Sequence, residues 1–364
     1  MCRCHGGFDW RSMRRLAWIL ALTVLGIPIR AVTSQPPPLS RMPDLQATHS
    51  VLVVAPHPDD ESLCCGGLIE LARRAGARVT IAWVTLGDGS RLDAIVTRRT
   101  LRPGPAGYRS LAERRAGEAR AAADILSVPR SGQFLLGYPD RGILPLTVAF
   151  HSSPWRSRRT QESAVYLPEA FAPGSAYEGQ NLERDLARVV QEVHPTLVLA
   201  PSPQDAHPDH RGTGLMTLRV MSARGELDRV RYWIVHGGRG WPRPRALRPD
   251  LPQTPPPRGA GMEWEYVPLD SAARETKRRA IQAHASQMKV MGRIMISYVR
   301  ATELYARVPA PQIDAYCAAH GSCVSPDESL DEFAHVEGGS MDLEVEEPER
   351  VRPGISETPF ASPH

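Results

Sequence analysis

Short apolar runs alternate with amphipathic stretches through the middle of the chain. The run VLVVA at 51–55 is continuous and rich in β-branched residues, which is typical of a strand buried on both faces of a parallel sheet. Further runs predict strands at 79–85, 133–136, 196–200 and 230–235. Helical patterns separate them, at 63–75, at 111–126, at 182–193 and after His207. The alternation predicts a doubly wound, Rossmann-like α/β fold, with a mostly parallel sheet and helices on both faces.

The first residues have a different pattern. Arg11, Arg14 and Arg15 precede an apolar run from Leu16 to Ile29, which is the layout of an export signal. The run is shorter than the roughly 20 residues of a spanning helix, which favours a cleaved signal over a tilted signal anchor. We therefore expect an exported protein that is periplasmic, extracellular or membrane-tethered. Membrane contact is expected only through a retained signal segment.

These patterns divide the chain into four parts. We expect a signal peptide or anchor at 1–34, a proline-rich exposed linker at 35–47, a catalytic domain at 48–338 and a disordered acidic tail at 339–364. Residues 144–179 are rich in Pro, Ser and aromatic residues without periodicity, and they predict a long loop beside the site. Its aromatic residues are either a platform for a saccharide or loop packing.

Composition excludes some classes of protein. The formal net charge is only +4 and the arginines are spread along the sequence, so nucleic-acid binding gets no support. The cysteines show no CxxC pairing, which argues against a metal site built from cysteine. Cys64 and Cys65 are expected to be small apolar residues on a buried helix. Cys317 and Cys323 are either a disulfide or two separate thiols.

Two histidine- and aspartate-rich motifs follow predicted strands. His57-Pro58-Asp59-Asp60-Glu61 comes directly after the first strand, and His207-Pro208-Asp209-His210 follows the strand at 196–200. Each motif alone could be a helix start. Both, however, lie at carboxyl ends of parallel strands, where ligands bind in open α/β sheets. Imidazole and carboxylate suit Zn²⁺, and a catalytic zinc needs about three protein ligands, so together the motifs predict a metal site.

At this point the sequence resembles a known family. APHPDDESLCCGG, a second HPDH and the segment TLGDG are similar to the PIG-L/LmbE-like zinc deacetylases, over about Ser50 to Val336. The resemblance implies a zinc-dependent de-N-acetylase that acts on an N-acetylated amino sugar or glycoconjugate. It implies that His57, Asp60 and His210 bind the metal, with Asp59 as general base. His207 would stabilise the oxyanion or protonate the departing amine, with Asp209 orienting the ring of His207.

Other residues are candidates for substrate binding. Asp88, Arg115 and Asp140 could hold sugar hydroxyls through directional hydrogen bonds. Arg115 could equally form a solvated ion pair with Glu118, and Asp88 could belong to an ordinary turn. Asp205 stands where some thiol-biosynthesis members of the family carry Tyr, so the sugar cannot be taken over from those relatives.

Three rival functions remain at this stage. The same metal site could cleave a larger sugar-linked amide. The protein could also be an exported carbohydrate-binding protein without activity, although the intact Asp59 argues against this. A nucleotide-binding Rossmann protein is disfavoured because HPDDE stands where GxGxxG would be expected.

Overall fold

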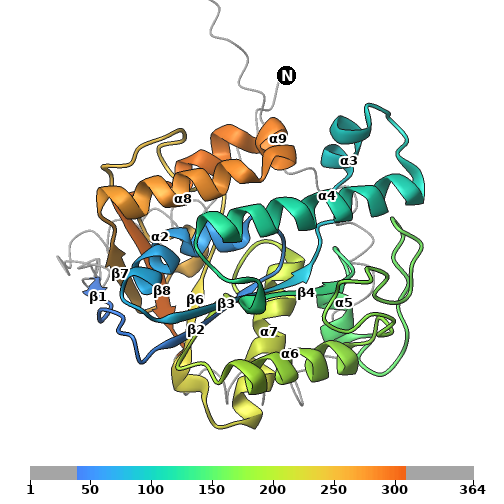
Figure 1. Ribbon diagram of the computed structural model, residues 1–364, viewed down its shortest axis with the longest axis horizontal. Helices are drawn as coiled ribbons and strands as arrows, with labels where there is room; N and C mark the ends of the chain where they lie inside the picture. Colours follow the sequence, from blue (N-terminus) through green and yellow to red (C-terminus); the bar gives the residue numbers. More distant parts are fainter. Residues whose placement is uncertain (1–38, 309–364) are drawn as a thin grey trace, which may run out of the picture. The chain divides into compact units, whose positions relative to one another are not determined.

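A computed structural model describes residues 39–308, and one eight-stranded sheet organises them (Figure 1). The strand order is β1-β7-β8-β6-β5-β2-β3-β4, and only β8 runs against the others. The strands are β1 Ser40–Arg41, β2 Ser50–Ala55, β3 Arg78–Thr85, β4 Gln133–Tyr138, β5 Leu197–Pro201, β6 Val230–Trp233, β7 Trp264–Pro268 and β8 Thr302–Arg307. The predicted mostly parallel sheet is confirmed; β1, β7 and β8 were not expected.

Helices cover both faces of the sheet, as predicted (Figure 1). One layer contains α2, α4 and α8, in which α8 packs against both α2 and α4, and the other contains α5, α6 and α7. The helices are α2 Asp60–Arg74, α3 Arg91–Arg98, α4 Gly104–Ile125, α5 Ile143–Val148, α6 Gly179–Val193, α7 Pro208–Ala223, α8 Ser271–Ala283 and α9 Ala285–Met295. Short 3₁₀ turns are η1 Arg130–Gly132, η2 Leu227–Arg229, η3 Pro257–Gly259 and η4 Ile296–Tyr298.

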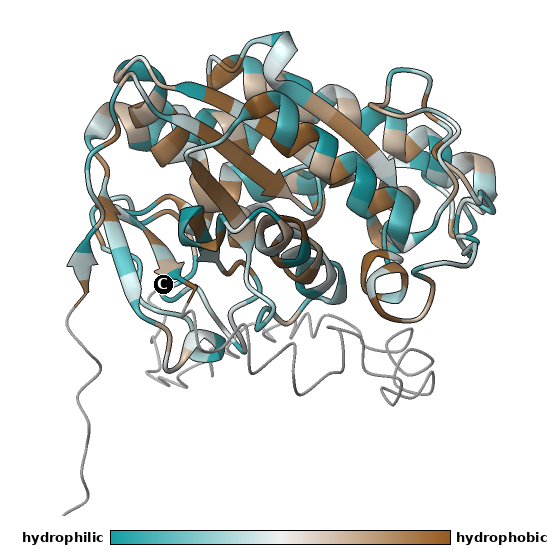
Figure 2. Ribbon diagram, turned by 90° about the horizontal axis from the view of Figure 1, so that it is seen from below, coloured by the Kyte–Doolittle hydropathy of each residue, from teal (hydrophilic) through white to brown (hydrophobic). Residues whose placement is uncertain are grey.

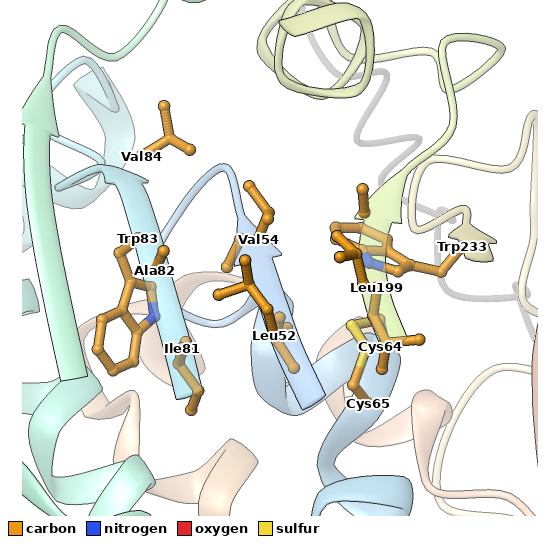
Figure 3. Close-up of a cluster of buried hydrophobic side chains, with 14 of the residues drawn as sticks. Leu52, Val54, Cys64, Cys65, Ile81, Ala82, Trp83, Val84, Leu199 and Trp233 are labelled. Carbon is orange, nitrogen blue, oxygen red and sulfur yellow. A yellow bond between two sulfur atoms is a disulfide. The ribbon is translucent and has the colours of Figure 1, made fainter. Parts of the chain in front are cut away.

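The central strands are apolar on both faces because helices cover both. Every residue of β2 is buried, and in Figure 2 the strands are brown between helices of mixed colour. Figure 3 shows Leu52 and Val54 of β2 between Ile81 of β3 and Leu199 of β5. These aliphatic neighbours and the helices on both faces bury β2. The first motif therefore starts from the end of a strand that is fixed in the core.

The chain order reverses at β2. From β2 the chain proceeds outward through β3 and β4 on one side, and β5 and β6 lie on the other. β2 and β5 are neighbours, with Val51 opposite Leu197 and Val53 opposite Leu199. Such a switch point opens a crevice outside the carboxyl ends of the two strands. HPDDE follows β2 and HPDH follows β5, so the fold places both motifs at that point.

Some expectations need correction. Ser40 and Arg41 form β1, paired with β7, and Met42 is buried, so this part of the predicted 35–47 linker belongs to the sheet. The predicted loop at 144–179 starts inside α5, and only an isolated bridge between Ala164 and Ala176 follows before α6. Cys64 and Cys65 are buried on α2 as expected, but a disulfide joins them.

Several predictions fall on residues that the structure does not describe. These are the signal segment at 1–34, the acidic tail at 339–364 and the pairing of Cys317 with Cys323. Among residues 39–308, no helix is long and apolar enough to cross a membrane.

Candidate metal centre and active site

The two motifs meet at the carboxylate of Asp60. Asp60 is the first residue of α2, and its Oδ2 lies 3.1 Å from Nδ1 of His57 and 3.1 Å from Nε2 of His210. His210 comes from the first turn of α7, 150 positions after Asp60 in the chain. The structure therefore brings together the three side chains predicted as metal ligands, with one nitrogen of each histidine 3.1 Å from the same Asp60 oxygen.

Carboxylates also hold the outer nitrogens of both histidines. Nε2 of His57 lies 3.3 Å from Oδ2 of Asp209 and 3.6 Å from Oδ1 of Asp140. Nδ1 of His210 lies 3.2 Å from Oδ2 of Asp205. Metal-binding histidines usually donate their second N–H to a carboxylate, which fixes the ring orientation. His57 has this arrangement with Asp209, and at His210 the Asp205 carboxylate lies within ion-pair distance of Nδ1.

Asp205 is a site residue that sequence reasoning missed. Its carboxylate also accepts from the backbone N–H groups of Val235 and His236, at 3.0 Å each, and of His207, at 2.9 Å. It therefore ties the start of α7 to the end of β6 behind His210. In the sequence Asp205 stood out only as a departure from a tyrosine of some relatives, because nothing local indicates that it faces His210.

The donor set fits Zn²⁺. His210 is fully buried, yet neither of its ring nitrogens makes a well-oriented hydrogen bond despite the short distances to Asp60 and Asp205. Burial alone would lower the pKa of His210, but the Asp60 and Asp205 carboxylates raise it to about 9. A site whose carboxylates favour a positive charge between them is suited to a cation, and two imidazoles with one carboxylate match catalytic zinc sites.

Asp59 has an unusual backbone conformation beside the predicted ligands. Its φ of 123° lies in a region that non-glycine residues rarely adopt. The conformation is held by contacts: the Asp59 N–H donates to Glu61 at 3.0 Å, and Gln287 donates to Oδ2 of Asp59. Burial and the neighbouring Asp60 carboxylate raise the pKa of Asp59 to about 7. A carboxylate with this pKa is matched to proton transfer near neutral pH.

The end of α8 and the start of α9 support this conformation. His284 is fully buried and lies 2.8 Å from Glu61, whose carboxylate also accepts from the Trp83 indole at 2.9 Å. His284 was not among the predicted site residues, and its position behind Glu61 agrees with that. Gln287, by contrast, touches Asp59 directly, and its role was not predicted because it follows from how α9 packs.

His207 lies at the rim of the site, as the N-cap of α7. Its Nδ1 accepts from the backbone N–H of Asp209 at 3.2 Å, so in the neutral ring Nε2 carries the proton. Burial and the positive charge of nearby histidines hold the pKa of His207 well below its usual value. His207 is thus a neutral hydrogen-bond donor that is only partly buried.

The role predicted for Asp209 needs correction. The Asp209 carboxylate does not reach the His207 ring: it accepts from the backbone N–H groups of Arg141 and Ile143, at 2.6 and 3.0 Å, and faces His57. Asp209 orients His207 through its backbone and His57 through its side chain.

Two of the three predicted sugar-binding residues brace loops instead. Arg115 is buried and donates to the backbone carbonyls of Gly87 and Pro58, while Glu118 binds Ser286, so the alternative Arg115–Glu118 ion pair does not form either. Asp88 is buried and accepts from the Tyr166 hydroxyl at 2.9 Å. These contacts favour a structural role for Arg115 and Asp88.

Asp140 differs from these two residues. Its Oδ2 accepts from the Gly89 N–H at 2.8 Å, and its Oδ1 faces His57. Of the three candidates for sugar binding, Asp140 is therefore the one placed beside His57 at the candidate metal centre.

Comparison with known proteins gives the class and then the family. Two histidine- and aspartate-rich motifs at the switch point of a doubly wound sheet are the arrangement of an α/β enzyme. Residues 52–221 of this chain match the family described as PIG-L: GlcNAc-PI de-N-acetylase.

Named relatives are similar over most of their length. A probable N-acetyl-alpha-D-glucosaminyl L-malate deacetylase 2 of Bacillus anthracis is 28% identical over 238 residues, covering 65% of this chain and 80% of that protein. A 1D-myo-inositol 2-acetamido-2-deoxy-alpha-D-glucopyranoside deacetylase of Actinosynnema mirum is 28% identical, and the match covers 68% of this chain and 83% of that protein. Among solved structures, N,N'-diacetylchitobiose deacetylase from Pyrococcus horikoshii is 19% identical with a TM-score of 0.43, and the match covers 70% of this chain and 82% of that one.

Proposed function

We propose that this protein is a zinc-dependent hydrolase that removes the acetyl group from an N-acetylated amino sugar or glycoconjugate. The observation that carries the proposal is the meeting of His57 and His210 at Asp60 Oδ2, both at 3.1 Å, with Asp59 beside them. The similarity to deacetylases of acetamido sugars supports the same reaction.

His57 through Nδ1, Asp60 through its carboxylate and His210 through Nε2 would hold the ion. When bound, Zn²⁺ supplies Lewis acidity, which polarises the acetamide carbonyl and lowers the pKa of water from 15.7 to about 7. The carboxylates of Asp209 and Asp205 would keep the two imidazoles in the tautomers that leave Nδ1 and Nε2, respectively, free for the metal.

Asp59 would take the proton of the attacking water. Its carboxylate is next in sequence to the ligand Asp60, and Gln287 fixes its direction. As the water oxygen bonds to the acetyl carbon, negative charge develops on the carbonyl oxygen. The Nε2–H of His207 can donate a hydrogen bond to that oxygen, and Asp59 can pass the proton taken from the water to the amine when the C–N bond breaks. Acetate and the free amino sugar are then the products.

The strained Asp59 argues against the carbohydrate-binding alternative. A non-glycine residue at φ 123° costs on the order of 1–3 kcal/mol, and such strain persists at functional sites. A protein that only bound sugars would gain nothing from it. The amidase alternative keeps the same metal and base, and differs only in the acyl group that is released.

We further propose that the protein is exported. The support is the arrangement of Arg11, Arg14 and Arg15 before the apolar run at 16–29, in the part of the chain outside the described residues. N-terminal sequencing of protein from its native host tests this, since a chain that begins at Met1 in the cytoplasm would contradict export.

The reaction is tested by measuring acetate release and bound zinc in a matched pair of variants. Asp59→Asn should hold zinc like the parent while kcat falls about 10²- to 10⁴-fold, the usual contribution of a positioned base. Asp60→Asn should lose zinc affinity, because an amide is a weaker ligand than a carboxylate, and added zinc should restore part of its rate. Equal rescue of both variants would show that the roles are wrongly assigned. Release from larger amides but from no N-acetyl sugar would favour the amidase.

A further inference from the structure

Exposed arginine and leucine side chains concentrate around the candidate site. They lie on three segments that we call the basic rim: α3 with the turn after it (91–102), the outer face of α9, and the loop at 237–258. We propose that the basic rim docks the protein onto an anionic lipid surface, with the candidate active site toward the membrane. This goes beyond the proposed reaction, and beyond the contact through a signal segment expected from the sequence.

The basic rim lies at the same edge of the sheet as the candidate site, because two of its segments follow carboxyl ends of strands and α9 packs beside α3. α3 follows the carboxyl end of β3, and the 237–258 loop follows that of β6 directly after His236. The His236 ring lies 4.7 Å from that of His210 and 5.1 Å from that of His207. α9 lies beside α3 (Figure 1), and Trp241 of the loop packs on Tyr298 just after α9, at 5.6 Å between ring centroids. The three segments are thus linked around one edge.

The apolar part of the basic rim is unusual for a soluble surface. Among the described residues, six large apolar side chains are exposed, and only Leu39 lies away from the basic rim. Leu92 and Val96 are one turn apart on α3, at 40% and 39% exposure, and Leu101 is 77% exposed. Leu247 and Leu251, at 40% and 43%, lie on the loop. Single exposed apolar residues are ordinary, but their confinement to one edge indicates an interaction surface.

Arginine and lysine side chains are exposed on the same three segments as these apolar residues. The α3 segment exposes Arg91, Arg98, Arg99 and Arg102, and α9 exposes Lys289 and Arg293. The loop exposes Arg243, Arg245, Arg248 and Arg258. The sequence spreads these arginines over 203 positions, from 91 to 293, but the fold gathers them at one edge.

Carboxylates do not neutralise this charge. The α3 segment contains Asp93, which is buried and lies 3.7 Å from Arg115, and the loop contains Asp250, which lies 3.7 Å from Arg274. Within residues 39–308, Arg243, Arg245 and Arg248 form no ion pair. Clustered like charges repel one another, so an anionic partner would stabilise this arrangement.

The loop is fixed in place, so its arginines are already presented. Arg300 lies beneath it, almost fully buried, and donates to the backbone carbonyls of Pro244 and Arg248. The Ala301 N–H donates to the Leu251 carbonyl at 2.8 Å. These bonds turn the loop carbonyls inward and leave the arginine and leucine side chains outside. A preformed surface loses little conformational entropy on binding.

The mixture of side chains favours lipid over nucleic acid. Lipid surfaces bind segments in which leucine enters the acyl boundary while arginine meets the phosphates. Single-stranded nucleic acid needs aromatic rings on which bases stack. The ring of Trp241, the aromatic residue of the loop, is packed on Tyr298. The basic rim therefore matches a bilayer containing anionic phospholipid.

Vesicle co-sedimentation of the full chain tests the proposal. The test variant is Arg243→Gln/Arg245→Gln/Arg248→Gln, and its charge-matched control is Arg78→Gln/Arg130→Gln/Arg224→Gln at the amino-terminal edge of the sheet. Since a juxtamembrane arginine contributes about 5-fold in affinity, the test variant should bind phosphatidylglycerol vesicles on the order of 10²-fold more weakly. The control should bind like the parent, and salt should weaken parental binding.

A second pair of variants tests the apolar part. Leu101→Ser/Leu247→Ser should also weaken vesicle binding, whereas Leu39→Ser, at the opposite edge, should not. Melting temperatures and bound zinc like those of the parent would show that each variant is folded. Equal binding to phosphatidylcholine and phosphatidylglycerol vesicles overturns the proposal. The proposal is also overturned if the arginine variant binds vesicles like the parent, or if its control loses vesicle binding to the same extent. It is likewise overturned if the arginine variant loses binding to RNA oligonucleotides but not to vesicles.

Discussion

The side-chain amide of Gln287 donates a hydrogen bond to Oδ2 of Asp59, 228 positions earlier in the chain. The bond joins the start of α9 to the loop between β2 and α2. It fixes the direction of the carboxylate that we propose as the general base, and it connects the packing of a late helix to the chemistry at the first strand.

Replacing Gln287 should therefore slow the reaction without removing the metal. Gln287→Leu removes a hydrogen bond to a charged group, and we expect kcat to fall about 10- to 100-fold with zinc content unchanged. Gln287→Glu should shift the acidic limb of the rate profile to higher pH, because a second carboxylate raises the pKa of Asp59. Steady-state kinetics over pH measure both effects. Gln282→Leu, exposed on α8, is the control, and a parental kcat in Gln287→Leu would contradict this role.

The backbone strain at Asp59 can be measured with two small residues. Asp59→Gly and Asp59→Ala both remove the carboxylate and its bond to Gln287, so their difference isolates the backbone conformation. At φ 123° glycine should be the more stable by about 1 kcal/mol or more, the reverse of its usual disadvantage against alanine. Urea unfolding of the two inactive variants gives the difference. If the alanine variant is equally or more stable, Asp59 is not strained.

The carboxylate behind His210 should control metal affinity. The Asp205 carboxylate now accepts from three backbone N–H groups and faces the His210 ring. Asp205→Asn leaves only one oxygen to serve these four groups. Loss of such an outer partner typically weakens metal binding about 10- to 100-fold. Chelator competition measures this, with Asp228→Asn at an exposed position as control. Parental zinc affinity in Asp205→Asn would exclude this role for the carboxylate.

Asp88 should make the stability of the fold depend on pH. Burial, then the nearby Asp140 carboxylate, raises the pKa of Asp88 from 3.8 to about 7. The folded protein thus binds a proton that the unfolded chain releases, and this contribution to stability is lost as pH rises from about 4 to about 7. Asp88→Asn should reduce that loss of stability by up to about 1.4 kcal/mol per pH unit, because asparagine does not titrate. The amide fits the same place, since the Tyr166 hydroxyl can turn to accept a hydrogen bond from it.

Urea unfolding across this pH window measures the effect of Asp88→Asn. The exposed Asp228→Asn should retain the pH dependence of the parent. An unchanged pH dependence in Asp88→Asn would show that another group causes it.

The sequence by itself determined the five central parallel strands of the sheet, the two motifs and their meeting. Buried parallel strands need apolar residues on both faces, which is a local pattern, and a residue that directly follows such a strand must lie at its carboxyl end. His57 and Asp60, close behind β2, could therefore be placed beside His210 without knowledge of side-chain packing. The same reasoning could not assign Asp88 and Arg115, because a short turn or a helix position does not reveal which side of the residue is buried.

Only the tertiary structure decided what surrounds the motifs. Gln287 and Asp205 act through contacts that depend on how α9 packs and how β6 ends, and neither belongs to a local pattern that predicts its partner. The basic rim is a still clearer case. Its arginines and leucines are dispersed in the sequence, and their charge is hidden in a modest net value of +4. The fold alone brings the ends of β3 and β6 to one edge and turns these side chains outward, because hydrogen bonds from Arg300 and Ala301 hold the loop carbonyls inward.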